Sequence, residues 1–279
     1  MIALIRADYL YLPVIVHPWK LLISLFLLFA GFVLNAWSWP RVLKHSSCPV
    51  PDPAGISSHG LSIFSKYIPG KFWVIMGRAE YLAAKYPYAR KDLASLSLEA
   101  QFMALWAALL LGTAGLILAG GLQLYGLLVL LLFVLLSLVV FTSYFHQLTE
   151  WIGKRILKKD IRLPRLSWRQ SVRGMLWYLL AWSTWSLAFW FLAASLVEGP
   201  VPFPIAFAFA LAGSIGILSV FAPGGLGVRE GILTAFLALN GLEIQDATTI
   251  GIASRLWFLV GEVFVFLLAF VLSRYLHKR

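Results

Sequence analysis

Apolar residues dominate this chain in long runs, and short polar stretches separate one run from the next. A membrane-spanning helix needs about 20 mainly apolar residues. By that rule the pattern predicts spans near residues 18–39, 97–119, 122–146, 174–197, 202–221 and 249–272, with a further, shorter apolar segment at 226–242. The pattern therefore predicts an all-α integral membrane protein, a single polytopic domain over residues 1–279 with about seven membrane segments.

A break interrupts the apolar stretch 202–242 at its centre. The apolar part that follows it, Gly231–Leu242, would rise only about 18 Å, less than a hydrocarbon core of about 30 Å. Non-helical backbone at membrane depth is tolerated only where protein or a water-filled cavity satisfies its polar groups. The stretch is therefore either one crossing followed by a short second one, or a re-entrant hairpin. The break consists of a proline, three glycines and a charge pair: Pro223, Gly224, Gly225, Gly227, Arg229 and Glu230.

A second break lies in the segment 58–84, where Pro69 and Gly70 stand between two apolar halves too short to cross a bilayer. The pattern predicts a re-entrant hairpin here. Arg78 follows this break as Arg229 follows the other, and paired broken elements are typical of repeat-built transporters. The alternative is a pair of interfacial turns whose basic side chains reach toward the headgroups.

Composition and charge agree with a membrane protein. Hydrophobic residues make up 61% of the chain and charged residues 13%, which excludes an ordinary soluble domain. The net charge of +11 comes mainly from basic residues in 40–96, 147–173 and the C-terminus. The positive-inside rule makes that side cytoplasmic, so we expect a cell (inner, cytoplasmic) membrane location with the N-terminus outside, and no nucleic-acid partner. Residues 148–159 resemble an interfacial helix suited to anionic lipids, but an ordinary positive-inside loop with no lipid specificity is the favoured interpretation, because such loops are routine.

Within the predicted spans stand the charged residues Glu99, near the start of the second, and Arg255 and Glu262, in the last. A charge at the bilayer centre costs about 2.5–3.5 kcal/mol on insertion scales, so each is expected to face the bundle interior. Arg255 and Glu262 share a helix face about 10 Å apart, too far for direct contact but suited to a polar track. The alternative is structural ion pairing between helices.

No metal or cofactor site is expected. The histidines are scattered, no Cys/His ligand spacing occurs, and Gly70-Lys71 lacks the earlier glycine and the following Ser/Thr of a phosphate-binding loop. The chain is therefore not expected to hydrolyse ATP. Two runs of small residues permit close helix packing and leave a homo-oligomer open; they are Ala104, Ala108, Gly112 and Ala208, Ala212, Gly216.

The two breaks, Ser97-Leu98-Glu99 and Arg255, taken in order and spacing, resemble the flippase-like family named after the lysylphosphatidylglycerol synthase transmembrane region. The resemblance spans about residues 18–275. It implies an integral membrane helical fold and lipid movement between leaflets; stand-alone members often accompany polyprenyl-linked sugar pathways. No soluble aminoacyl-transfer domain is present, so synthesis of lysyl-lipid is not implied. Met1–His17 is expected to form a short outside tail where members usually carry an extra helix.

The leading hypothesis is a flippase-like transporter, rather than an enzyme, for an anionic phospholipid or a polyprenyl-phosphate-linked lipid. The two breaks, with Pro69, Gly70, Trp73 and the glycines around Pro223, would meet and line a groove. The lipid phosphate would bind Lys71, Arg78, Arg229 or Arg255, while Glu99, Glu230 and Glu262 balance charge or relay protons. The alternatives are a membrane-embedded transferase on a polyprenyl-phosphate lipid and a non-catalytic partner of a glycosyltransferase or another lipid-modifying enzyme.

Overall fold

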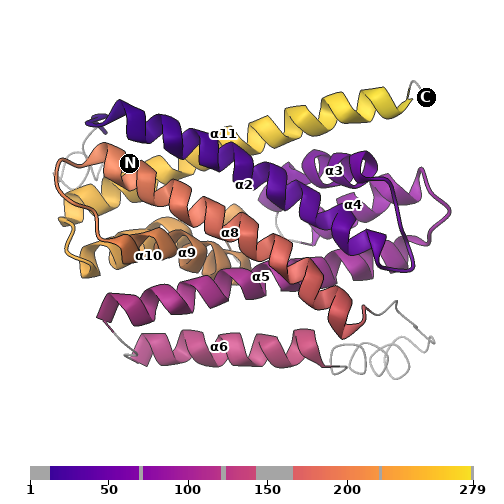
Figure 1. Cartoon of the computed structure of the whole chain (residues 1–279), viewed down its shortest axis with the longest axis horizontal. Helices are drawn as coiled ribbons and strands as arrows, with labels where there is room; N and C mark the ends of the chain where they lie inside the picture. The colour runs from indigo at the N-terminus through magenta and orange to yellow at the C-terminus, as the bar shows by residue number, and fades with distance from the viewer. Residues whose placement is uncertain (1–12, 69–71, 121–123, 143–165, 220–221, 278–279) are drawn as a thin grey trace.

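A computed structural model describes residues 13–68, 72–120, 124–142, 166–219 and 222–277. These residues form helices and connecting turns, with no β-strand among them (Figure 1). The α-helices are α2 (Pro18–Lys44), α3 (Asp52–Leu61), α4 (Trp73–Ala83), α5 (Arg90–Gly120), α6 (Leu124–Phe141), α8 (Trp168–Leu196), α9 (Ala208–Leu218), α10 (Val228–Leu239) and α11 (Ile244–His277). Short 3-10 turns stand between some of them: η1 (Ile63–Tyr67), η2 (Phe203–Phe207) and η3 (Pro223–Gly225).

Among the described residues, four helices are long and apolar enough to cross a membrane: α2, α5, α8 and α11. They have 27, 31, 29 and 34 residues, so even the shortest rises about 40 Å. Shorter apolar helices, including α6 and α9, accompany them. The chain is therefore a multi-pass membrane protein with an all-helical fold, as the sequence predicted.

The long helices extend beyond the apolar windows that revealed them. The window 18–39 belongs to a helix that ends at Lys44, and the window 97–119 to one that begins at Arg90. The extra turns carry charged residues, which a hydropathy rule leaves out although their backbone is helical. Part of the predicted span 122–146, the predicted interfacial helix at 148–159 and residues 1–12 of the predicted tail lie outside the described residues.

Helices α2 and α8 pack side by side and antiparallel along their whole length (Figure 1). At one end His17 N donates to Ser195 O over 3.1 Å, and at the other the Gln170 side chain donates to His45 O. Between these ends the backbones are close, because a Cβ on Gly31 would lie 2.4 Å from Trp185 Cδ1. This pair forms one wall of the bundle.

Helix α11 crosses the middle of that wall. A Cβ on Gly261 would lie 2.1 Å from Cε2 of Phe32, which stands near the centre of α2. Farther along, α3 also packs closely on α11, since a Cβ on Gly60 would lie 2.5 Å from Cβ of Ala269. Residues near Gly261 are therefore at mid-height in the bundle.

The small-residue runs are used inside the chain. Helix α5 packs on α9, where a Cβ on Gly112 would lie 3.0 Å from Leu211 Cα, and Ala108, Ala208 and Ala212 are fully buried. These buried residues of the two runs are covered by the chain's own helices.

Two short helical hairpins approach each other from opposite ends of the bundle. Helices α3 and α4 lie at the end where α2 finishes and α5 begins, while α9 and α10 lie at the end where α8 finishes and α11 begins (Figure 1). Each pair is in mutual contact, and the turns η1 and η3 also touch. The segment 58–84 and the stretch 202–242 thus bring the ends of two hairpins together inside the bundle.

Candidate functional site

The break in the stretch 202–242 has a backbone that only glycine adopts easily. Gly224, Gly225 and Gly227 have φ angles of 60°, 71° and 80°, a left-handed region that disfavours residues with a Cβ. Space is also short, since a Cβ on Gly224 would lie 2.7 Å from Cε1 of Tyr67 in the other hairpin. The glycines therefore shape the turn that leads into α10 and let η1 approach η3.

Arg255 of α11 holds this turn in place. Its Nη1 donates to Gly224 O over 3.0 Å, and its guanidinium carbon lies 5.3 Å from the centre of the Tyr67 ring. Its Nε lies 3.9 Å from Glu230 Oε1. Glu230 in turn accepts a 2.7 Å hydrogen bond from Gly227 N, which caps the first turn of α10.

Glu262, two turns farther along α11, binds the first hairpin. Lys66 Nζ lies 2.5 Å from its Oε1, and the Tyr67 hydroxyl donates to its Oε2 over 2.8 Å. The residue is 1% exposed, and both of its oxygens have a partner. Tyr67 thus contacts both Arg255 and Glu262, two residues of α11 that the sequence analysis expected to lie too far apart to touch each other.

Arg229 follows the break and packs its stem where Gly216 leaves room, since a Cβ there would lie 2.6 Å from Arg229 Cγ. Its guanidinium carbon lies 5.0 Å from the ring centre of Phe209 and 4.8 Å from that of Phe258. Such cation–π contacts are favourable when the cation is removed from water. Among the described residues Arg229 makes no hydrogen bond and no ion pair.

We call Lys66, Tyr67, Arg229, Glu230, Arg255 and Glu262 the central charged cluster. It lies at mid-height, because Glu262 adjoins Gly261 at the centre of α2. Within it three basic side chains face two carboxylates, which leaves one positive charge in excess among the described residues. Unpaired charge in an apolar interior is costly, so this site favours an additional anion.

Arg78 lies apart from this cluster, among α2, α3, α4 and α8. It is 7% exposed, and its guanidinium carbon lies 5.8 Å from the ring centre of Trp39. In the part of the chain that the structure describes, its Nε has no hydrogen-bond partner, and the same holds for the Tyr178 hydroxyl and for His59 Nδ1. Arg78 is thus a second buried cation, and polar side chains beside it lack a hydrogen-bond partner among the described residues.

The remaining nominated residues are spread out. Pro223 opens the turn η3, Trp73 opens α4 and stacks on Phe72 with ring centres 4.4 Å apart, and Glu99 is partly buried on α5. Pro69, Gly70 and Lys71 lie outside the described residues. No group of three or more potential metal-ligating side chains occurs in the described ranges.

Sequence reasoning did not nominate Lys66 or Tyr67 as site residues. Both stand just before the Pro-Gly break and are the partners of Glu262, 196 and 195 residues away. The available signal was the charge of Glu262 itself, because a carboxylate inside a span needs a nearby cation or donor. Nothing in the local sequence shows which cation is the one that binds.

Comparison with models of protein families assigns the chain to one family. The profile of the family described as the lysylphosphatidylglycerol synthase TM region matches residues 4–274, almost the whole sequence. The protein therefore belongs to this family of membrane proteins, as the resemblance had indicated. A comparison with curated protein sequences finds no match.

Proposed function

We propose that this protein is a flippase-like transporter, and that it moves an anionic lipid between leaflets by binding the lipid phosphate at the central charged cluster. The observation that carries the proposal is the excess positive charge of that cluster, with Arg229 lacking an ion pair among the described residues. Family membership supports a membrane-lipid function in general. A phosphate beside Arg229 and Arg255 would gain charge-assisted hydrogen bonds that the protein leaves unmade.

The two hairpins supply the means of access. We propose that residues 202–242 re-enter the membrane rather than cross it, and that the segment 58–84 does the same from the opposite face. Helices α9 and α10, of 11 and 12 residues, rise only about 16–18 Å each and lie at the same end of the bundle (Figure 1). Half-height elements that meet at mid-depth are how many transporters build a site between two faces.

Movement through such a site needs no large rearrangement of the long helices. Tyr67 and Gly224 join the two hairpins, so a small shift of either hairpin would open the cluster toward one face. Glu230 and Glu262 would balance the basic residues whenever the phosphate is absent. The sequence contains no nucleotide-binding loop, so we propose that transport runs downhill or uses the membrane potential, worth about 2.3 kcal/mol per charge per 100 mV.

The substrate class is an amphiphile with a phosphate, either an anionic phospholipid or a polyprenyl-phosphate lipid. The test is leaflet-resolved movement of fluorescent phosphatidylglycerol and of a fluorescent polyprenyl-phosphate sugar in liposomes that contain the purified protein. Arg229→Gln is the main variant. Arg274→Gln is its control, because Arg274 is an exposed arginine on α11 outside the cluster.

We expect the native protein and Arg274→Gln to move at least one of the two lipids. Arg229→Gln should slow this movement at least about tenfold, because it removes one charge-assisted hydrogen bond to the phosphate. The preferred lipid identifies the substrate class. Native rates in Arg229→Gln and Arg255→Gln would contradict binding at the cluster. No movement of either lipid by the folded native protein would contradict the transporter itself.

A further inference from the structure

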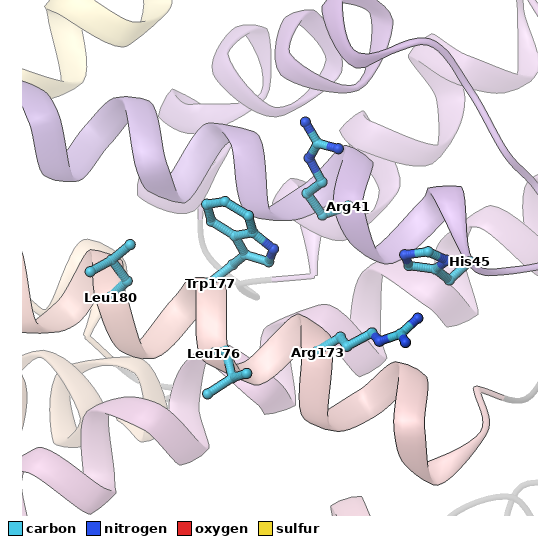
Figure 2. A pocket seen from close by; sticks show the side chains of 6 residues that line it. All are labelled: Arg41, His45, Arg173, Leu176, Trp177 and Leu180. Atoms are coloured by element: carbon cyan, nitrogen blue, oxygen red, sulfur yellow. The ribbon is translucent and has the colours of Figure 1, made fainter.

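A pocket of about 420 Å³ lies between the end of α2 and the first half of α8, away from the central charged cluster (Figure 2). It shares no residue with that cluster. Six residues line it: Arg41, His45, Arg173, Leu176, Trp177 and Leu180. Leu176 and Leu180 are 59% and 47% exposed, whereas Tyr178 on the other face of α8 is buried, so the pocket faces outward, away from the bundle interior.

The end of the pocket nearest the helix termini is basic. Arg41 and His45 come from the last turn of α2 and the residue after it, and Arg173 from the second turn of α8 (Figure 2). Arg41 is already paired, since its Nη2 lies 3.0 Å from Asp52 Oδ2. Arg173 is exposed and makes no ion pair with any described residue, so its charge is available to a ligand.

Aromatic rings fix the position of the basic end. Trp177 stacks with Trp37 of α2 with ring centres 6.3 Å apart, and the Arg41 guanidinium carbon lies 5.1 and 5.9 Å from the two rings. A cation held over two rings and bound to a carboxylate loses little further freedom when an anion arrives. The site is therefore built before a ligand binds.

The other end of the pocket is apolar. Leu176 and Leu180 follow Arg173 at one-turn intervals along α8, toward the middle of the bundle (Figure 2). A phospholipid in a leaflet has the same order, with its phosphate at the interface and its acyl chains toward the bilayer centre. An inorganic anion would contact only the basic end of the pocket and would make no apolar contact with Leu176 and Leu180.

We propose that this pocket binds an anionic phospholipid of the surrounding leaflet, as a bound lipid and not as the transported one. Arg173 and Arg41 would bind the phosphate, His45 would offer a further ring nitrogen, and one acyl chain would lie along Leu176 and Leu180. A lipid held here would bridge α2 and α8 at the basic end of the bundle. The proposal stands whether or not the protein moves lipids.

The test is native mass spectrometry of the full chain in detergent, titrated with phosphatidylglycerol and separately with phosphatidylcholine. Arg173→Gln is compared with Arg169→Gln, since Arg169 is an exposed arginine one turn away that does not line the pocket. We expect Arg173→Gln to weaken binding of the first phosphatidylglycerol about fivefold, the effect of about 1 kcal/mol per basic residue near an anionic lipid. Arg169→Gln should change it by less than about twofold.

A second pair of variants tests the apolar end. Leu180→Trp should fill the pocket and weaken the same binding, whereas Leu187→Trp, two turns farther along α8 and also exposed, should not. Equal losses in Arg173→Gln and Arg169→Gln would reduce the effect to general surface charge and overturn the proposal. Equal affinity for phosphatidylcholine, or full affinity in both Arg173→Gln and Leu180→Trp, would also overturn it.

Discussion

Glu262 is the residue through which α11 binds the first hairpin. It comes from α11, is almost fully buried, and accepts from Lys66 and Tyr67 of the first hairpin. A buried carboxylate with two donors is well satisfied, but the same carboxylate without them would be an isolated charge. The ion pair between Lys66 and Glu262 as a whole therefore adds little to the free energy of unfolding. Removing only one of its two side chains lowers that free energy strongly, because a buried charge is left without a partner.

The first prediction concerns this pair. Glu262→Gln leaves the Lys66 ammonium without a counter-charge and should lower the free energy of unfolding by up to about 3–5 kcal/mol. Lys66→Met alone should also destabilise the protein, and the double variant should be less destabilised than the sum of the two. A double-mutant cycle measured by denaturant unfolding in detergent gives the coupling energy directly.

The control for this cycle is the ion pair between Glu80 and Arg90, whose atoms are 3.0 Å apart but whose side chains are 53% and 69% exposed. Solvent screens such a pair, so its coupling energy should not exceed about 1 kcal/mol. Equal coupling energies in the two cycles would contradict the structural role given to Glu262.

The second prediction concerns Gly224. Gly224→Ala places a Cβ at φ 60° and 2.7 Å from the Tyr67 ring, so it should lower stability by about 1–3 kcal/mol. Gly231→Ala is the control within the same hairpin, because nothing lies within 4 Å of its Cβ position in α10. That variant should be stabilised by about 0.5–1 kcal/mol. In thermal unfolding, the melting temperature should fall in Gly224→Ala and rise in Gly231→Ala. An unchanged melting temperature in Gly224→Ala would contradict the strain inferred for this turn.

At the level of elements, hydropathy was sufficient to predict the long helices. It did not predict whether the short helices α9 and α10 continue across the bilayer or turn back. Helices α2, α5, α8 and α11 were all visible as apolar windows, because the hydrocarbon core selects for length and apolarity together. The stretch 202–242 left a crossing and a hairpin open, because Gly231–Leu242 has the same composition whichever way α10 runs. Direction depends on what α9 and α10 pack against.

Part of the candidate site could also be inferred from the sequence. Charge within an apolar segment identified four of the residues, because such a charge is costly and is kept only where it has a partner or a function. They are Arg229, Glu230, Arg255 and Glu262. Their partners could not be identified in this way, because Lys66 and Tyr67 lie nearly 200 residues earlier and only the packing of η1 against η3 brings them near. The aromatic rings of Phe209 and Phe258 beside Arg229 were indistinguishable from ordinary core residues in the sequence.

At the level of the whole molecule, the two ends of the bundle differ in charge. Arg41 and Lys44 end α2, Arg90 begins α5, and Arg173 lies near the start of α8, all at the same end in Figure 1. The opposite end has the acidic Glu198 in the connection after α8. By the positive-inside rule we propose that the basic end faces the cytoplasm, which would put the N-terminus outside and the C-terminus inside.

The third prediction tests this orientation. In a Cys48→Ser background, a cysteine at Glu198 should react with a membrane-impermeant maleimide on intact cells, and a cysteine at Ser47 only after permeabilisation. Both positions are exposed, whereas the native Cys48 is buried and burial raises the pKa of its thiol. The reverse labelling pattern would invert the proposed topology.

The separation of Lys66 from Glu262 also has a consequence for biosynthesis. At about 5–20 residues per second, roughly 10–40 s pass between synthesis of the lysine and synthesis of its partner 196 residues later. During that time the first hairpin holds a cation that nothing in α11 can yet neutralise. The nascent chain must keep that segment in contact with water, or with the insertion machinery, until the last helix arrives. The first hairpin therefore reaches its paired state only after α11 has been synthesised and brings the carboxylate that binds Lys66.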